Sequence, residues 1–214
     1  MSIVEEAKRF VEQVTGLGRP KPKQLADLVR PVIPQRYRFK NDGETPNNPS
    51  LPLLLYRRAI VLPHQFDPAA VIETLFAHNG WKESWRDGVY DFLHFHTQTH
   101  EVLGIARGSV RVQFGGTHGK IIALKAGDVV VLPAGTGHRR TTQSDDLLVV
   151  GAYPATGRYD EPQPGEIDHD EAAAAIAKTR LPARDPVYGS TGPLRKLWRK
   201  HASHAPRRSP LTLR

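Results

Sequence analysis

The sequence predicts a mainly β protein, built as an antiparallel sandwich or barrel with helical segments at both ends. Apolar residues recur with period two in short segments, at 90–96, 101–106, 109–114, 120–124, 128–132 and 147–152. Glycine-bearing turns separate these segments so closely that no crossover helix fits between them, which favours antiparallel pairing. The 214 residues suffice for one ordinary domain with extensions, and we expect the β domain at 36–157.

An N-terminal helical extension is expected at 1–35. Residues 2–5 fit a capping box, and the apolar residues of 3–15 fall on one face of a helix. Glycines and prolines interrupt the chain at 16–22. A short second helix is predicted at 24–30.

One helix should precede the central strands. We expect residues 37–62 to be extended chain interrupted by turns. After them, the pair Asp67 and Pro68 is typical of a helix N-terminus. The apolar stripe of this helix stops at Asn79 and Gly80, where we expect it to end.

Residues 158–214 predict a C-terminal helical segment and a basic tail. Asp168 or Asp170 is expected to cap an alanine-rich helix that ends near Lys178, and 194–201 predicts a further basic amphipathic turn or two. The net charge of +8 comes from this tail, because seven basic residues and no acidic residue follow position 193 and the rest of the chain carries only +1. A basic tail can bind nucleic-acid phosphates, but we favour a solvated terminus and do not expect nucleic acid as a partner.

Several classes of protein are excluded by what the sequence lacks. The absence of cysteine excludes a disulfide scaffold, a thiolate zinc site and a cysteine nucleophile. No apolar run approaches the roughly 18 residues that a membrane span needs, and the acidic N-terminus does not resemble a secretory signal. We therefore expect a cytoplasmic protein without a membrane partner, and no motif for an organic cofactor is present.

Four side chains are candidates for metal ligands. In an extended strand, residues two apart point to the same side, so His94 and His96 can present both imidazoles to one point. Glu101 is an odd number of positions from His96, so a turn at 97–100 must reset the alternation before the carboxylate can join them. His138 would approach from a different strand. Three imidazoles and one carboxylate suit iron, manganese, nickel, cobalt or zinc, and they leave positions open for water, substrate or dioxygen.

The spacing of these residues resembles the paired motifs of the cupin superfamily. The positions that match in order and spacing are Gly88, His94, His96, Glu101 and Gly108, then Gly127, Pro133, Gly135 and His138. The stretches SWRDGV, THEVLG, QFGG, GDVVVLPAG and VVGAYP are similar to small single-domain bacterial cupins of the YjlB type, a likeness that implies an architecture but no reaction.

The resemblance implies a cupin double-stranded β-helix, which is an antiparallel jelly-roll barrel, with one divalent transition metal held by His94, His96, Glu101 and His138. The motifs span 88–142, and one departure from them is Thr142, where asparagine is common. A barrel that keeps these ligands but holds no metal, or holds it only for rigidity, is the alternative.

Further residues near the motifs are candidates for roles beside the four ligands. His100 points away from Glu101 by strand alternation, so we favour a place behind the ligands or on the surface rather than a fifth ligand. The candidates for contact with a substrate are Tyr90, Arg140 and Thr142, with Phe92 beside them. Arg140 is either an anchor for a carboxylate or phosphate, or an outward solvated arginine. No residue is assigned a catalytic step.

The expected function is that of a metal-dependent dioxygenase or isomerase that acts on a small polar, carboxylate-like or carbohydrate-like molecule. A non-catalytic protein that binds or senses a small molecule or a metal is the alternative. Similar proteins commonly pair through an outer sheet face, and the apolar strand at 129–132 is consistent with a homodimer.

Overall fold

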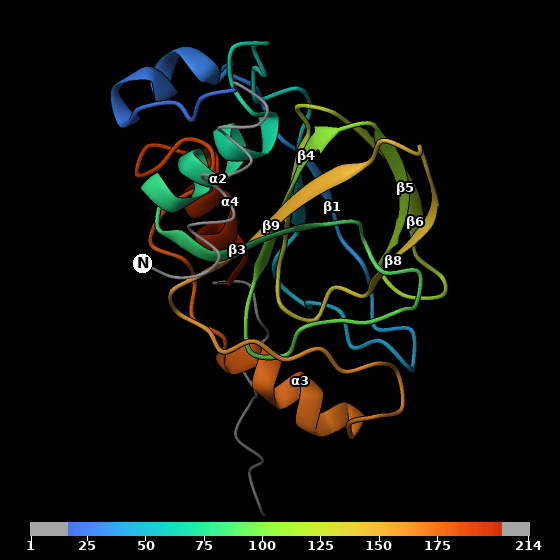
Figure 1. Ribbon diagram of the computed structural model, residues 1–214. Helices are drawn as coiled ribbons and strands as arrows, with labels where there is room; N and C mark the ends of the chain where they lie inside the picture. The colour runs from blue at the N-terminus through green and yellow to red at the C-terminus, as the bar shows by residue number, and fades with distance from the viewer. Residues whose placement is uncertain (1–16, 203–214) are drawn as a thin grey trace, which may run out of the picture.

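The computed structural model describes residues 17–202, with side chains as far as Arg199 (Figure 1). The helix predicted at 3–15 and the end of the basic tail lie outside the described residues. Within 17–202, no helix combines the length and the apolar character needed to cross a membrane.

Nine strands form two antiparallel sheets within the described residues, which confirms the predicted mainly β fold at this level. The six-stranded sheet has the order β1 (Gln35–Tyr37), β2 (Leu53–Tyr56), β7 (Val129–Leu132), β4 (Glu101–Arg107), β9 (Leu148–Pro154), β3 (Trp81–Asp87). The three-stranded sheet has the order β6 (Lys120–Lys125), β5 (Ser109–Phe114), β8 (His138–Gln143). The two sheets face one another (Figure 1).

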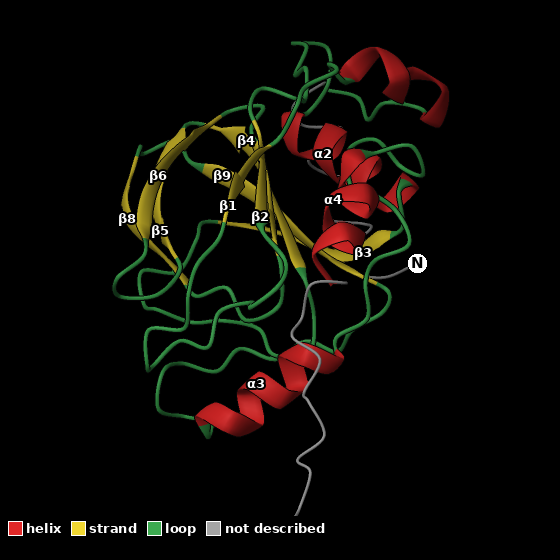
Figure 2. Cartoon of the chain, turned by 180° about the vertical axis from the view of Figure 1, so that it is seen from behind, coloured by secondary structure: helices red, strands yellow, loops and turns green. Residues whose placement is uncertain are grey.

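The helices agree with the capping signals in the sequence. Helix α2 (Pro68–His78) begins after Asp67, whose side chain accepts a hydrogen bond from the Ala69 amide at 3.1 Å. Helix α3 (His169–Lys178) is capped by Asp168. The short helix predicted at 24–30 is a 3-10 helix, η1 (Pro22–Leu28), and α4 (Pro193–Ala202) lies beside α2 whereas α3 lies apart from both (Figure 2).

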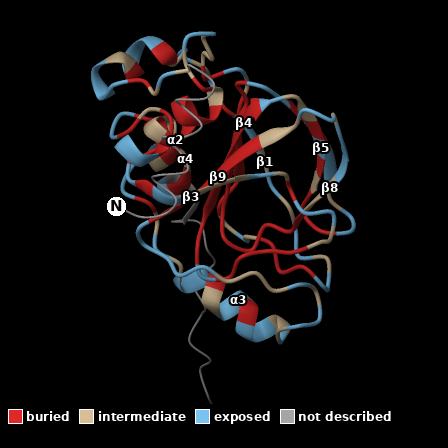
Figure 3. Ribbon diagram, viewed as in Figure 1, coloured by how far each residue is buried: buried red, intermediate tan, exposed pale blue. Residues whose placement is uncertain are grey.

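Apolar side chains pack on both faces of the six-stranded sheet. Its central strands are accordingly buried (Figure 3). On β7, Val130 and Leu132 contribute to the core between the two sheets, whereas Val129 and Val131 contribute to the core beneath the helices α2 and α4. Burial of one such side chain contributes about 1.5–3 kcal/mol to folding. Because this chain itself covers both faces of β7, the two-sided apolar character of 129–132 needs no second subunit, and the homodimer stays a prediction without that support.

Part of the C-terminal segment belongs to the same core as the sheet. Trp198 of α4 is fully buried, and its indole nitrogen donates to the Pro52 carbonyl at 3.0 Å. Asp185 is also fully buried and accepts a hydrogen bond from the Tyr56 hydroxyl at 2.7 Å. Residues 185–198 therefore pack as an integral layer over β2 and are not an appendage.

Two strand predictions differ from the structure. Residues 90–96 form no regular strand, although backbone hydrogen bonds such as His138 N to His94 O at 2.9 Å hold this segment beside β8. Strand β3 was not predicted, because its sequence WKESWRD is polar and an irregularity between Lys82 and Trp85 breaks the alternation. As an edge strand it pairs only with β9, so its outward side chains remain in water.

We predict that Tyr56→Phe lowers the free energy of unfolding by about 1.5–3 kcal/mol, because a hydrogen bond to a buried carboxylate is lost. Burial, together with Asp185, raises the pKa of Tyr56 above its ordinary value of 10.0. The unfolded chain therefore releases this proton first, and wild-type stability should fall as the pH rises above about 10. Urea unfolding followed by circular dichroism at pH 7 to 11 checks both effects. Tyr37→Phe, at an exposed hydroxyl, is the control, and an equally steep alkaline loss in Tyr56→Phe would contradict the assignment.

Candidate metal centre

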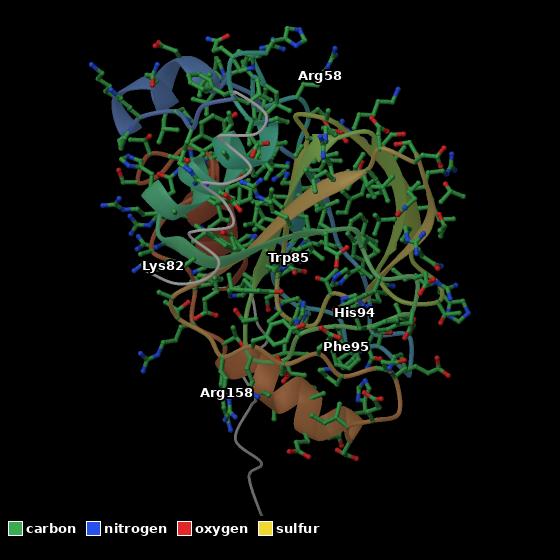
Figure 4. All side chains as sticks on the ribbon, in the orientation of Figure 1. Arg58, Lys82, Trp85, His94, Phe95 and Arg158 are labelled. Carbon is green, nitrogen blue, oxygen red and sulfur yellow. The ribbon has the colours of Figure 1, made fainter. Side chains whose placement is uncertain are left out.

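Three histidine side chains from two segments meet between the sheets. His94 and His96 lie on the segment that connects β3 to β4, and His138 is the first residue of β8. One nitrogen from each ring lies within 4.8 Å of the other two, and all three residues are buried (Figure 4, where His94 is labelled). The structure thus brings together the three histidines that the sequence predicts.

Each of these rings is held by a backbone carbonyl. Nδ1 of His94 lies 3.2 Å from the Phe92 carbonyl oxygen, and Nδ1 of His138 lies 3.0 Å from that of Thr136. Nδ1 of His96 makes a short contact with the carbonyl oxygen of Asp160. A carbonyl can only accept, so each Nδ1 carries the hydrogen and each Nε2 presents its lone pair. This is the arrangement in which histidine binds a metal through Nε2.

Glu101 lies next to two of the three histidines, after the bend that the alternation of the chain requires. The chain bends at Thr97 and Gln98, after which β4 begins at Glu101. Its Oε2 atom lies 3.3 Å from Nε2 of His96 and 3.3 Å from Nε2 of His138.

The unpaired atoms in this group fit a metal ion. Among the described residues, Oε2 of Glu101 and Nε2 of His96 are buried and have no hydrogen-bond partner. With the hydrogen on Nδ1, both atoms present lone pairs to one another, which is unfavourable in a buried place unless a metal ion or a proton lies between them. A set of three imidazole nitrogens and one carboxylate oxygen suits a divalent transition metal.

The protonation of His94 and Glu101 favours ligation, whereas at His96 a proton would compete with a metal ion. Burial lowers the pKa of His94 to about 3, and the neighbouring His138 contributes to this shift. Burial opposes ionisation of Glu101, but His96 and His138 outweigh it and hold the pKa of this carboxyl well below its usual range. Burial alone would lower the pKa of His96, yet the Glu101 carboxylate raises it above its usual value. At neutral pH the site therefore offers a carboxylate and a neutral His94.

A cavity of about 480 Å³ opens over these four side chains, large enough for a small molecule. Its remaining lining consists of Glu83, Trp85, Arg86, Asp87, Gly88, Val89, Tyr90, Leu103, Tyr153, Tyr159 and Glu161. Trp85 donates its indole hydrogen to the Tyr153 hydroxyl at 3.0 Å. Gly151, opposite Trp85 on β9, makes room for this ring, because a Cβ atom there would lie 2.0 Å from Trp85 Cε2.

Of the three candidate residues for contact with a substrate, one lies at the cavity. Tyr90 lines it, but Arg140 and Thr142 are not part of its lining. Arg140 donates to the Val89 carbonyl at 3.0 Å and pairs with Asp91 at 3.3 Å, so it braces the segment that leads to His94. Thr142 is exposed at a separate hollow on the three-stranded sheet.

His100 lies behind the site, as the alternation predicts. Its Nδ1 accepts a hydrogen bond from the Ala134 amide at 2.9 Å, and its ring centre lies 4.7 Å from that of Trp198. It is buried and faces α4 rather than the other three histidines.

Sequence reasoning missed the residues that follow β9. The carboxylate of Asp160 accepts hydrogen bonds from the amides of Thr97 at 3.0 Å and Gln98 at 3.1 Å, while its carbonyl holds His96. Tyr159 and Glu161 on either side of it line the cavity. Polar residues in an irregular segment show no periodicity, so only the three-dimensional fold reveals their place at the site.

The comparison with known proteins finds one close relative. The chain is 39% identical over 166 residues to a protein of Bacillus subtilis (strain 168) described as "Uncharacterized protein YjlB", and the match covers 78% of this chain and 97% of that protein. No family model matches the chain.

Solved structures give weaker matches. Acireductone dioxygenase from Bacillus anthracis is 20% identical with a TM-score of 0.32, over 42% of this chain and 61% of that one. The 3,4-ketoisomerase QdtA from Thermoanaerobacterium thermosaccharolyticum is 16% identical with a TM-score of 0.37, over 59% and 94%. A variant of oxalate decarboxylase OxdC from Bacillus subtilis is 18% identical with a TM-score of 0.34, over 59% and 32%. Likeness at this level is no guide to a reaction or a substrate.

We predict that His138→Ala lowers the affinity for zinc at least tenfold, whereas His100→Ala has a far smaller effect because His100 faces α4. Competition with a chromophoric chelator measures both affinities, and circular dichroism verifies that each variant is folded. Equal losses in the two variants would show that the ligands are wrongly assigned.

Glu101→Gln should separate metal binding from folding. The amide of glutamine can donate to Nε2 of His96, so the metal-free variant should melt at or above the temperature of the metal-free wild type. Zinc should raise the melting temperature of the wild type but hardly that of the variant. Differential scanning fluorimetry at pH 8, with EDTA or with zinc, measures both. A zinc-induced rise of equal size in the variant would exclude Glu101 as a ligand.

Proposed function

We propose that this chain, which belongs to the family of Bacillus subtilis YjlB, is a cupin and a metal-dependent enzyme that acts on a small polar molecule. The metal would be held by His94, His96, Glu101 and His138, and the molecule would occupy the adjoining cavity. The observation that carries the proposal is the meeting of unpartnered Nε2 and Oε2 lone pairs at the wall of that cavity.

The place of these ligands favours a reaction over a structural role. A structural metal site is usually closed by protein ligands, whereas these four side chains lie at a cavity that reaches solvent. When bound, the ion would act as a Lewis acid on substrate oxygens or, as iron, support chemistry with dioxygen. Iron, manganese, nickel, cobalt and zinc all fit the donor set. We therefore propose a dioxygenase or an isomerase.

Residues of the chain other than the ligands would bind and orient the substrate. Burial, together with the Glu101 carboxylate, raises the pKa of Tyr153 above its usual range, so this hydroxyl keeps its proton and serves as a hydrogen-bond donor. Trp85 and Tyr90 form walls against which an apolar ring face can pack. Of the two substrate types expected from the sequence, the carbohydrate-like one fits these walls, whereas Arg140 does not reach the cavity to hold a carboxylate.

The finer architecture is part of the same proposal. The facing sheets would form the two halves of a double-stranded β-helix barrel within 36–157, with the site between them and the segments 1–35 and 158–214 flanking it. A cytoplasmic homodimer stays a prediction.

A non-catalytic protein that binds or senses a small molecule is the second candidate. It is favoured by Tyr153, a lining residue beside His96 whose raised pKa keeps its proton on the hydroxyl, so that it binds a ligand without exchanging a proton with it. Such a protein would bind metal and ligand without turnover.

Elemental analysis of protein purified without chelator or metal-affinity resin tests the proposal. We expect about one transition-metal ion per chain in the wild type and less than about a tenth of that in a His96→Ala, His138→Ala double variant. The absence of metal from the wild type, even after incubation with iron, manganese or zinc salts, would overturn it. Oxygen uptake or isomerisation of hydroxylated probes by the metal-loaded protein then distinguishes an enzyme from a binding protein.

A further inference from the structure

We infer that the cavity selects a small molecule with a positively charged ammonium group and disfavours carboxylates. This inference rests on the proposed function for the metal-facing part of the cavity, where an oxygen of the same molecule would meet the ion. It concerns the rest of the lining, whose charges and aromatic rings belong to the chain alone.

Acidic groups dominate the charged lining of the cavity. Besides Glu101 these are Glu83 and Asp87 on β3 and Glu161 on the segment after β9. Within residues 17–199 none of these three carboxylates takes part in an ion pair. Asp87 accepts a hydrogen bond from the Gly88 amide at 2.7 Å, and Glu161 accepts one from the Tyr159 hydroxyl. Their negative charge is therefore open to a ligand.

The one arginine or lysine of the described lining, Arg86, already forms ion pairs with two carboxylates. Its Nε and Nη2 donate to the two oxygens of Glu73 at 2.9 and 2.8 Å, and its Nη1 donates to Asp67 at 2.7 Å. Both acceptors belong to α2 and its cap, so they hold the guanidinium against the helix. Because two carboxylates already neutralise its charge, Arg86 is a poor partner for a substrate carboxylate.

A bound metal does not reverse this balance. A divalent ion keeps a single net positive charge once the Glu101 carboxylate is counted, and three further carboxylates face the same cavity. The unpartnered Glu101 Oε2 and His96 Nε2, each in a residue at most 4% exposed, show independently that this cavity is built to receive a ligand at its inner end.

Aromatic rings complement the acidic groups. Tyr153 and Tyr159 lie with their ring centres 5.2 Å apart, and Tyr90 and Tyr159 are about half exposed at 48% and 47%. The faces of tyrosine and tryptophan rings attract organic cations, and carboxylates beside them add to that attraction. The rings of Tyr153 and Tyr159 lie 5.7 and 5.4 Å from that of His96, centre to centre, so a small molecule could place its ammonium group among the rings and an oxygen at the histidines.

Fluorescence quenching of metal-free protein tests the charge of the cavity without requiring a metal. Of the three tryptophans, Trp81 and Trp198 are 1% and 0% exposed, so the accessible emission comes from Trp85 in the cavity wall. Caesium and iodide are compared at constant ionic strength, each relative to its quenching of N-acetyltryptophanamide. A negative potential of about half kT makes the relative caesium constant about threefold larger than the iodide constant. Trp85→Phe should abolish the quenchable emission.

Paired variants assign the effect to its residues. Glu83→Gln with Glu161→Gln should bring the ratio of caesium to iodide quenching close to one. Glu44→Gln with Glu171→Gln removes the same charge from exposed positions outside the lining and should leave the threefold ratio unchanged. A wild-type ratio at or below one, or an equal fall in both double variants, would overturn the inference.

Binding of matched probes to zinc-loaded protein tests selectivity. The probes 1-amino-1-deoxyglucitol, glucitol and gluconate share a chain of hydroxyl groups and differ in charge at one carbon. By isothermal titration calorimetry we expect the amine to bind at least tenfold more tightly than gluconate, with the difference lost in Glu83→Gln, Glu161→Gln. No binding of the amine, or equal or tighter binding of gluconate, would overturn the inference. A protein that shows the caesium preference but takes up no metal would instead contradict the proposed function.

Discussion

Two acceptor atoms that face one another without a hydrogen between them determine the character of this molecule. His96 Nε2 and Glu101 Oε2 lie 3.3 Å apart in a buried place, and the carbonyl of Asp160 holds the hydrogen of His96 on the opposite ring nitrogen. A flip of the ring would sacrifice that hydrogen bond, so the contact persists unless a cation or a proton comes between the two atoms. In the metal-free protein a proton relieves this contact, because the Glu101 carboxylate raises the pKa of His96, and a metal ion bound as proposed would take the place of that proton.

The rest of the fold serves to hold these atoms in place. Glu101 begins a central strand of the six-stranded sheet and His138 begins an edge strand of the three-stranded sheet, so the site lies where the two sheets meet. The apolar side chains between the sheets set their separation, and the packed helices α2 and α4 support the larger sheet from behind. The same helix α2 supplies Glu73, which draws the charge of Arg86 away from the cavity. Helix α2 therefore contributes both to the packing of the core and to the charge of the cavity.

The sequence alone predicts the candidate ligands better than it predicts their surroundings. His94 and His96 are identified by their spacing and His138 by the motif resemblance, and the odd separation of Glu101 from His96 requires the bend that the chain makes at 97–98. The alternation could not reveal that Arg140 braces the segment before His94, since a pairing partner such as Asp91 is set by tertiary contacts. The sequence also does not predict strand β3 or the segment at 159–161, for a related reason. Strand β3 is polar and irregular, and the segment at 159–161 shows no periodicity. Long-range contacts order both of them.

The hydrogen bond between the Asp160 carbonyl and the His96 ring joins residues that are 64 positions apart in the sequence. This separation has a consequence for biosynthesis. During translation the two motif histidines leave the ribosome early, but His138 and then the carbonyl that orients His96 emerge only later. A nascent chain thus has no complete set of donors until most of the β domain has been made. If the chain binds a metal as proposed, acquisition of the ion is a late event in the life of each molecule, and cellular metal supply acts on the nearly finished polypeptide rather than on its first folded parts.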